Sequence, residues 1–465
     1  MVAACAMIAA CGPGEWRPPA ALDSHEDPMK MRPGFGNDAL HTWWPLTEAE
    51  VAAVSGIERA RQGDAHALLA LAVFASADKR DGESYARYAD RVDRFVEGVR
   101  KTMEGSADDW HRGDALNRAM HASFLTGAPD RKDPELGAYQ LDQARLTRVF
   151  EEGHFNCISS ALLYTILARA FTLSVRGVIT TTHAFVEADA ADKRVDVETT
   201  TSDGYGRVHD EHYYAEQAVK WSSSRGLKPM TFDDYKKRDI VPPYAFVARS
   251  MNDARISNSD TQGRLSEVAA MIEPDNADLA YNRMVAYVNE GKWLYDHKAS
   301  RTMLRLVEVI APVVSDIATK FASNAKVMPL VAWMAWYDAA ALEIVGRGDE
   351  ALSVADDALD RVDPSWSDAA LLKNDLLGVL LDRMTELQTK GEYEKSLAAV
   401  AKRIPACLAN AACQNNLYLT FDGWSARFQQ ANDYPGARKV LERCIALLPG
   451  DTRCRAALET IGSAK

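Results

Sequence analysis

Residues suited to nucleophilic acyl transfer occur in a fixed order between residues 153 and 206. Cys157 comes first, His183 follows, and the acidic residues Asp196 and Glu198 come last. In this chemistry a thiolate attacks a carbonyl carbon, an imidazole carries the proton, and a carboxylate orients the imidazole. The order therefore predicts a cysteine nucleophile, a histidine base and one carboxylate partner.

The cysteine opens a strongly apolar segment that begins after Asn156. Its apolar residues are Ile158, Leu162, Leu163, Ile166, Leu167 and Phe171. They are too numerous for the single apolar face of a surface helix, so we expect a buried helix. A thiol at a helix N-terminus lies at the positive end of the peptide dipoles, which favours the thiolate.

β-Branched residues predict strands on both sides of His183. The expected strands are 173–175, 178–182, 184–186 and 195–200, with a polar turn at 187–194. In the last strand, alternation places Asp196, Glu198 and Thr200 on one face. We therefore expect a hairpin whose returning strand carries the acid toward the histidine.

Together these pieces resemble the transglutaminase-like superfamily, which has a papain-like α+β core. The family pattern is a cysteine opening a helix, then His-Ala-aromatic-Val-Glu, then an acidic residue followed two positions on by Thr. The chain has Cys157, then the segment His183–Glu187, then Glu198 followed by Thr200. Two positions differ from the pattern, since Glu198 replaces the usual Asp and Phe185 the usual Trp.

The resemblance implies a peptide or protein amide hydrolase, or an acyltransferase, that works through a thioester without a cofactor. Cys157 would attack, His183 would move the proton, and Glu198 would hold the histidine tautomer. The Cys157 backbone N–H and the Asn156 side chain are the expected oxyanion donors. Asp196 is the second candidate acid, which we expect to face solvent or a neighbouring base.

Two other interpretations of these residues stay open. The first is a zinc site from His154, Cys157 and His183, although no second cysteine or clear fourth ligand is near them in sequence. The second starts from the fact that a cysteine in an apolar helix is commonly a core residue. The chain would then be a non-catalytic interaction protein with a relic core, and its Cys157 would not alkylate selectively.

The 465-residue chain is acidic, with a net charge of −12 and a pI near 5.4. This charge argues against nucleic acids and anionic lipid headgroups as partners. Hydrophobic residues make up 47% and charged residues 26%, as in ordinary globular proteins. After the N-terminus, no stretch approaches the roughly 18 uninterrupted apolar residues of a membrane span.

The first residues predict export and lipidation. Residues 8–12 resemble a bacterial lipobox with Cys11 as the lipidated residue, and residues 2–5, ending at Cys5, fit the pattern less well. A basic segment and a longer apolar core should precede such a site, so we expect the printed chain to start inside the signal. Residues 12–45 are expected to tether the protein, outside the cytoplasm, to a bacterial membrane, with the outer membrane favoured. The alternative is an alanine-rich cytosolic N-terminus.

Helices are predicted on both sides of the core. Thr47 and Glu50 form a capping box, and the helices expected after it are 66–77, 85–103, 114–125 and 141–151. We expect a helical segment at 46–135, the catalytic domain at 136–250 and helical repeats at 260–465. Residues 205–247 are expected either to line the active-site cleft or to complete the fold of the catalytic domain. Pro242–Pro243 is expected to mark the boundary at the end of that domain.

The repeats are indicated by turn residues followed five positions later by a small residue. The pairs are Gly346 with Ala351, Gly391 with Ser396, and Asn432 with Ala437. This pattern resembles tetratricopeptide repeats, although the spacing exceeds the ~34 residues of the standard repeat. Such repeats bind a partner protein or serve as a scaffold.

Four cysteines of the repeat region form two close pairs in sequence, Cys407 with Cys413 and Cys444 with Cys454. Even, local pairing of this kind predicts two disulfides in an oxidising compartment. Cys157 would then be the free thiol. The disulfides and the lipobox both favour a location outside the cytoplasm.

Overall fold

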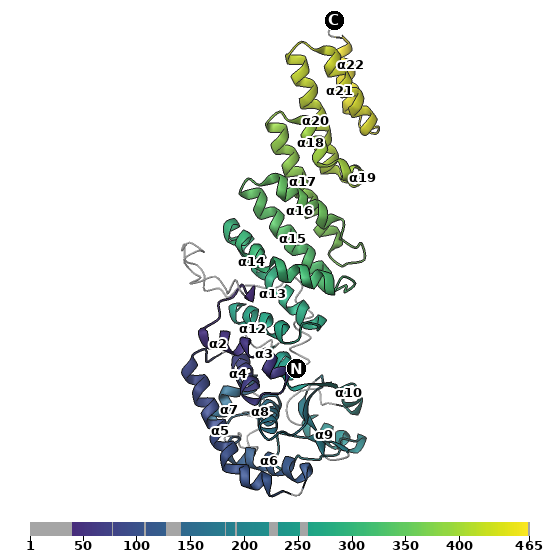
Figure 1. Ribbon diagram of the computed structural model, residues 1–465. Helices are drawn as coiled ribbons and strands as arrows, with labels where there is room; N and C mark the ends of the chain where they lie inside the picture. The colour runs from purple at the N-terminus through teal and green to yellow at the C-terminus, as the bar shows by residue number, and fades with distance from the viewer. Residues whose placement is uncertain are drawn as a thin grey trace. The chain divides into compact units, whose positions relative to one another are not determined.

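The computed structural model describes residues 40–463 except 77, 107, 127–140, 182, 191–192, 223–230 and 252–258. Of these described residues, 71% are helical, and a small four-stranded antiparallel sheet accompanies the helices (Figure 1). It forms two compact units that divide between Ala286 and Tyr287, inside helix α13 (Ala277–Asp296). The expected lipidation site Cys11 and most of the expected tether lie outside the described residues.

The first unit begins with helices that the sequence largely predicts. They are α2 (Glu48–Ser55), α3 (Ile57–Arg61), α4 (Ala65–Ser76), α5 (Gly82–Glu104), α6 (Asp109–Ser123), the 3₁₀ helix η2 (Leu141–Ala144), α7 (Leu146–Glu152) and α8 (Cys157–Ala170). The capping box at Thr47 is confirmed, since its hydroxyl and the Glu50 carboxylate each accept the other residue's backbone N–H. The helix expected at 141–151 is divided because Arg145 has an extended backbone.

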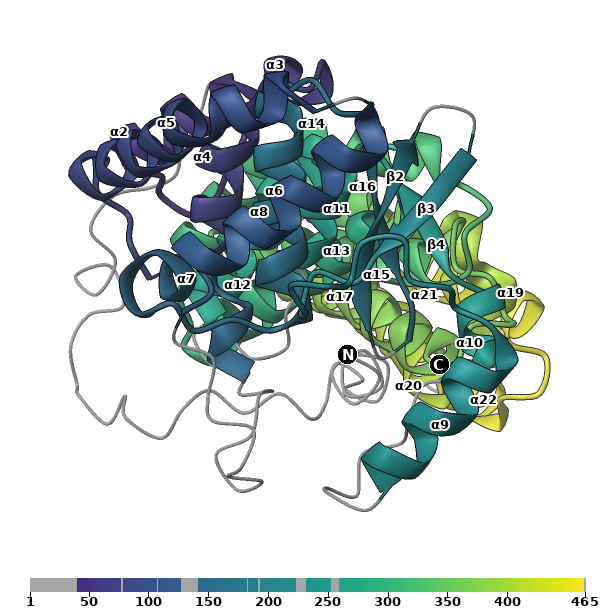
Figure 2. The same cartoon turned by 90° about the horizontal axis from the view of Figure 1, so that it is seen from below.

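Four strands form one sheet in the order β3-β2-β1-β4, with every pair antiparallel. They are β1 (Val175–Ile179), β2 (Ala184–Ala190), β3 (Lys193–Val197) and β4 (Asp239–Val241). Figure 2 labels β2, β3 and β4 of this sheet. The polar turn expected at 187–194 is shorter, because Glu187 is buried within β2 and pairs in register with Asp196. The strand expected to reach Thr200 ends at Val197, because the Glu198 N–H donates to the Gly204 carbonyl in a turn.

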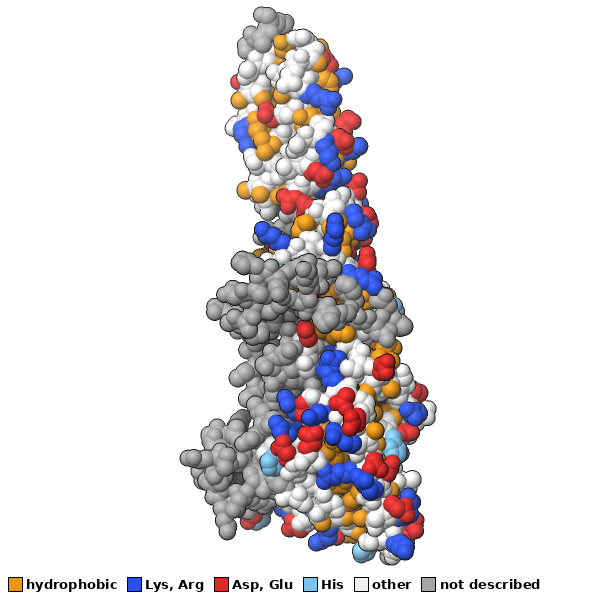
Figure 3. Space-filling view, turned by 90° about the vertical axis from the view of Figure 1, so that its left-hand side faces the viewer, with side chains coloured by type: hydrophobic (Ala, Val, Ile, Leu, Met, Phe, Trp, Pro, Cys, Tyr) orange, Lys and Arg blue, Asp and Glu red, His pale blue; other side chains and the backbone are white. Residues whose placement is uncertain are grey.

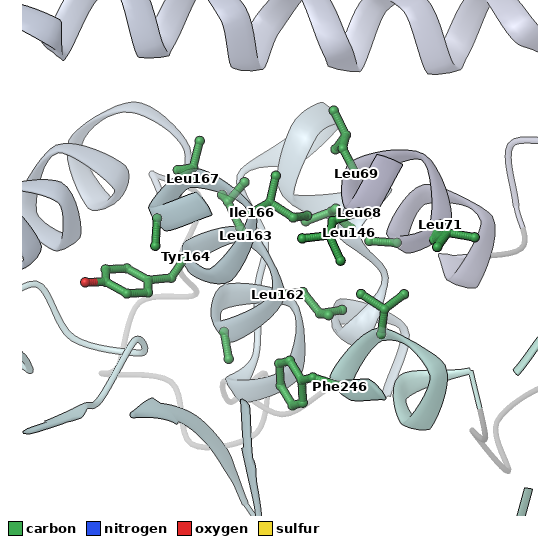
Figure 4. Close-up of a cluster of buried hydrophobic side chains, with 14 of the residues drawn as sticks. Leu68, Leu69, Leu71, Leu146, Leu162, Leu163, Tyr164, Ile166, Leu167 and Phe246 are labelled. Atoms are coloured by element: carbon green, nitrogen blue, oxygen red, sulfur yellow. The ribbon is translucent and has the colours of Figure 1, made fainter. Parts of the chain in front are cut away.

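The core of this unit surrounds α8, every residue of which is buried from Cys157 to Ala168. Figure 4 shows some of these side chains, among them Leu162 and Ile166. Helix α8 packs against β1 and β2 and against the helices α4, α6, α7 and α11 (Pro243–Ser250). The expected boundary at Pro242–Pro243 instead lies inside the unit, because Pro243 begins α11. A Cβ on Gly177 of β1 would lie 2.3 Å from the Phe246 ring of α11, so this contact requires glycine.

Helices α9 (Glu211–Ser222), α10 (Phe232–Lys236) and α12 (Ser259–Ile272) complete the first unit together with the start of α13. The residues of α12 that belong to this unit's apolar core are Leu265, Val268, Ala269, Ala270, Met271 and Ile272. The first unit therefore extends past residue 260, where the sequence placed the start of the repeats.

All regular secondary structure among the described residues of the second unit is helical. Its helices after α13 are α14 (Ser300–Lys320), α15 (Val327–Ile344), α16 (Gly348–Leu359), α17 (Ala369–Thr389), α18 (Tyr393–Ala399), the 3₁₀ helix η3 (Ala401–Arg403), α19 (Ile404–Leu408), α20 (Ala411–Gln430), α21 (Tyr434–Leu447) and α22 (Thr452–Ser463). Gly346, Gly391 and Asn432 adopt the left-handed conformation between helices, with φ of 83°, 74° and 60°. The small residues expected after these turns are all buried. The turn-and-small-residue pattern therefore marks helix–helix corners.

One further corner of this kind escaped the sequence pattern. Lys298 has φ of 57° between α13 and α14, and Met303 lies five positions later, fully buried. Lysine is not a typical left-handed turn residue and methionine is not small, so composition gave no signal there.

Both predicted disulfides are present, Cys407–Cys413 and Cys444–Cys454. Each bridge connects neighbouring helices, α19 with α20 and α21 with α22. Among the described cysteines, Cys157 is the one outside a disulfide. The sequence pairing is therefore confirmed.

Helix α15 is long and apolar enough to cross a membrane by length and composition alone, although the sequence led us to expect no such helix. It carries Asp338 and Glu343, and 67% of it is buried in the structure, as in the core helix of a folded domain.

On the face shown in Figure 3, acidic and basic side chains are interspersed over the described residues.

Candidate active site

Cys157 is the first residue of α8, where the backbone N–H groups of the helix lack partners within the helix. Asn156 caps the helix: its Oδ1 accepts from the N–H groups of Ile158 at 2.9 Å and Ser159 at 3.3 Å. The Ser159 hydroxyl in turn accepts from the Asn156 N–H at 3.1 Å. Asn156, expected as an oxyanion donor, thus uses its side-chain oxygen to fix the helix start beneath the thiol.

His183 lies at the turn between β1 and β2, directly before Ala184. The Thr180 backbone N–H and hydroxyl donate to the His183 carbonyl at 2.9 and 3.0 Å, and the His183 N–H donates to the Thr180 Oγ1 at 2.9 Å. The imidazole stacks on Phe185, with 6.0 Å between ring centroids. These contacts hold the imidazole at the end of the sheet that packs on α8.

Glu198 pairs with His183. Its Oε2 lies 2.6 Å from the His183 Nε2, and its Oε1 accepts a hydrogen bond from the Thr200 hydroxyl at 2.7 Å. The hydroxyls of Thr199 and Ser160 lie 2.9 Å apart, which joins the loop after Glu198 to the helix that carries Cys157. The Nε2 contact leaves Nδ1 as the imidazole nitrogen available to the thiol.

The charges of the three groups favour a thiolate beside an imidazolium. Burial opposes the thiolate, but hydrogen bonding to His183, the His183 charge and the Ala184 backbone N–H lower the pKa of Cys157. Burial likewise opposes the imidazolium, but the Glu198 charge and hydrogen bonds to Cys157 and Glu198 raise the pKa of His183 well above its ordinary value. For Glu198, burial is outweighed by the His183 charge and by hydrogen bonds from His183 and Thr200, so its pKa falls to about 2.

Asp196 has other partners. Its Oδ2 lies 2.8 Å from the Nδ1 of His209 and accepts a hydrogen bond from the Tyr235 hydroxyl at 2.7 Å. The residue is 8% exposed, so it faces a neighbouring base and not solvent. The structure therefore gives the two candidate acids to two different histidines.

The comparisons with known proteins add no assignment. No family model, curated protein or solved structure matches this chain. The functional argument therefore depends on the geometry of these side chains.

The structure does not support a zinc site formed by His154, Cys157 and His183, because His154 has another partner. The His154 Nδ1 lies 2.9 Å from the Glu152 Oε2, so the imidazole is directed to the exposed end of α7. Within the described part of the chain, no three His, Cys, Asp or Glu residues gather as metal ligands would.

The sequence assigns no role to His209, which lies in the stretch 205–247. This histidine is surrounded by aromatic rings from β2, α9 and α10. They are Phe185 at 4.9 Å, Tyr213 at 4.9 Å, Tyr235 at 5.3 Å and Tyr214 at 5.8 Å between centroids. The richness of this stretch in His and Tyr was the available signal. Its contact with Phe185 places it directly behind His183.

Proposed function

We propose that this protein is a cysteine-dependent amide hydrolase or acyltransferase with a transglutaminase-like, papain-like core. The observation that supports the proposal is the convergence of a helix N-terminal thiol, Cys157, with the hydrogen-bonded pair of His183 and Glu198. Along the chain, the helix that begins at Cys157 comes before the hairpin that presents His183 and Glu198. This is the order of the transglutaminase-like pattern. The substrates proposed are peptides or proteins, and the chemistry needs no cofactor.

The residues present support the following steps. The Cys157 thiolate attacks the amide carbonyl carbon, and a carbon–sulfur bond forms while the carbonyl electron pair moves onto oxygen. The backbone N–H of Cys157, at the helix N-terminus, is suited to stabilise that oxyanion. His183 then protonates the leaving nitrogen, the carbon–nitrogen bond breaks, and a thioester remains. Glu198 stabilises the imidazolium before this transfer and holds the ring after it.

The second half of the reaction restores the thiolate. His183 takes a proton from water, whose oxygen attacks the thioester, and the carbon–sulfur bond breaks to give a carboxylic acid. An amine in place of water gives a new amide, which is the transferase outcome. Hydrolysis is the first choice because water is the default acceptor.

A specific observation favours a second candidate, a non-catalytic interaction protein. Cys157 is only 7% exposed, as an inert core cysteine would be. In that case the helical second unit, with its tetratricopeptide-like corners, would carry the function by binding a partner protein. Selective alkylation of Cys157 distinguishes the two, because an inert core thiol does not react ahead of others.

We further propose that the protein works outside the bacterial cytoplasm as a lipid-anchored protein. The two disulfides in the second unit support an oxidising compartment. The lipobox-like residues around Cys11 support the lipid anchor.

The deciding experiment compares wild type and Cys157→Ala on an unbiased peptide library, with a labelled amine present as a second acceptor. Cleavage or label incorporation by wild type alone supports the enzyme and separates hydrolysis from transfer. Identical product profiles for the two proteins, both shown to be folded by circular dichroism, would refute it.

A further inference from the structure

Asp196 and His209 form a second buried acid–histidine pair that the mechanism above does not use. The His209 side chain is 1% exposed and that of Asp196 is 10% exposed. Neither is open to a substrate, so this pair is not a second catalytic centre. Burying an acid–histidine pair costs desolvation and is weak evidence for stability alone, so its presence behind the site needs another reason.

Phe185 is the link between the two histidines. It is fully buried, stacks on His183 and meets His209 edge-on, with 4.9 Å between the Phe185 and His209 ring centroids. Tyr235 also stacks on Phe185, and its hydroxyl is bonded to Asp196. A displacement of His209 or Tyr235 would therefore move the ring on which the His183 imidazole rests.

The backbone makes a second link. Asp196 is the second-to-last residue of β3, two residues before Glu198. Its carbonyl accepts the Gly206 N–H, and the Glu198 N–H donates to the Gly204 carbonyl. The loop between them thus closes on itself from Asp196 to Gly206. His209 lies just beyond, so its bond to the Asp196 side chain locks the far end of the loop that presents Glu198.

Within the described part of the chain, five charged or titratable side chains surround His209. They are Asp196 and Glu198 from β3 and the loop after it, Tyr213 and Tyr214 from α9, and Tyr235 from α10. The His209 charge contributes, after the larger effects of His183 and Thr200, to the low pKa of Glu198. The pair thus acts on Glu198 through charge as well as through geometry.

We propose that Asp196, His209 and Tyr235 form a positioning assembly for the His183–Glu198 pair, acting through Phe185 and through the loop 198–206. This inference rests on the proposed function, because the pair being positioned is the one that would activate Cys157. It assigns His209 and Tyr235 roles that their place in sequence did not indicate.

The test is the pH profile of iodoacetamide alkylation at Cys157, measured on the full chain by peptide mass spectrometry. His209→Phe keeps a ring against Phe185 but removes the bond to Asp196 and the charge. We expect its rate at neutral pH to fall by about tenfold, the loss typical of one positioning hydrogen bond. The acid-side midpoint should also move to higher pH, which a simple loss of folded protein would not cause.

Two further variants make the result unambiguous. Tyr235→Phe removes the hydroxyl that donates to the Asp196 carboxylate, and it should shift the pH profile in the same direction but by less. If His209→Phe does not fold, Tyr235→Phe is sufficient for the test. Asp189→Asn is the matched control, because Asp189 also pairs on this sheet, with Ser174 and Arg176, but at the opposite end of β2 from His183.

If Cys157 is reactive in the wild-type protein and the folded variants show the same pH profile, the positioning role is overturned and the proposed function is unaffected. A wild-type Cys157 that reacts no faster than an ordinary buried thiol overturns both. A shifted profile in Asp189→Asn as large as that in His209→Phe also overturns the positioning role, since any sheet perturbation would then suffice.

Discussion

The Thr200 hydroxyl donates to one oxygen of the Glu198 carboxylate at 2.7 Å, and the other oxygen faces His183 at 2.6 Å. The threonine thereby fixes the rotation of the carboxylate, so that one oxygen is committed to the imidazole. Asp196 has no such hydroxyl partner two residues later, since that position is Glu198 itself. The spacing of two positions between the acidic residue and the threonine therefore has a physical reason: the threonine hydroxyl orients the carboxylate toward the histidine.

The two acids should differ sharply on substitution. We expect Glu198→Gln to reduce amide turnover strongly, by about 10²–10⁴, because the tautomer and the charge that supports the imidazolium are lost. Asp196→Asn should cost far less, because Asp196 touches His209 and not His183. Turnover of an identified amide substrate by both variants, with circular dichroism as the folding control, measures this. The reverse ranking would contradict the assignment.

The Cys157 thiolate should persist at acidic pH. Its lowered pKa means that the thiolate is lost only as the pH falls below the range of ordinary thiols, while His183, with its raised pKa, stays protonated there. At pH 6 an ordinary thiol is less than about 1% thiolate, so we expect Cys157 to alkylate at least about tenfold faster than free cysteine. Site-resolved mass spectrometry checks this. In Glu198→Gln the acid-side midpoint of the profile should move to higher pH, because His183 without the Glu198 charge is a weaker imidazolium partner and lowers the pKa of Cys157 less.

Removing a disulfide should destabilise the second unit modestly. The Cys444–Cys454 and Cys407–Cys413 bridges close short loops, separated by 10 and 6 residues. The chain-entropy model gives about 2–3 kcal/mol for each such loop. The double variant Cys444→Ser with Cys454→Ser should therefore unfold at a lower temperature in calorimetry. Peptide mapping without reductant that finds all four thiols free would contradict both bridges and weaken the extracytoplasmic proposal.

Two glycines of the second unit should respond in opposite directions to alanine. Gly346 has φ of 83°, and a Cβ there would meet nothing within 4 Å, so only backbone strain changes. We expect Gly346→Ala to destabilise by roughly 1–2 kcal/mol. Gly378 lies inside α17 with equally open surroundings, so Gly378→Ala should stabilise by about 0.5–1 kcal/mol. Urea unfolding measures the change in the free energy of unfolding for both variants. If the two changes have the same sign, the left-handed turn at Gly346 is not the cause of the effect.

Lipidation at Cys11 is the fifth expectation. Mass spectrometry of the native protein from a membrane fraction should find a mature chain that begins at a diacylated Cys11. An unmodified N-terminus upstream of Cys11 would rule the anchor out.

The sequence alone determined the features that depend on neighbours a few residues apart. The capping box at Thr47, the buried helix that opens at Cys157 and the turns at Gly346, Gly391 and Asn432 are all of this kind. Each is set by local backbone energetics, since a cap, a left-handed turn or an apolar periodicity acts within one or two helical turns. The short disulfides belong to the same class, because residues so close in sequence meet whenever the helices between them turn.

The resemblance already indicated Glu198 as the acid for His183, but tertiary structure alone decided the partner of Asp196. Alternation placed Asp196 and Glu198 on one face of a strand, but the strand ends at Val197, where the Glu198 backbone bonds to Gly204 and enters a turn. Asp196 stays within the sheet and pairs with His209, 13 residues away, because the segment just before α9 brings this histidine to that edge and α10 brings Tyr235. Where a strand ends and which distant helix covers its edge depend on burial across the whole unit, and no local pattern contains that information.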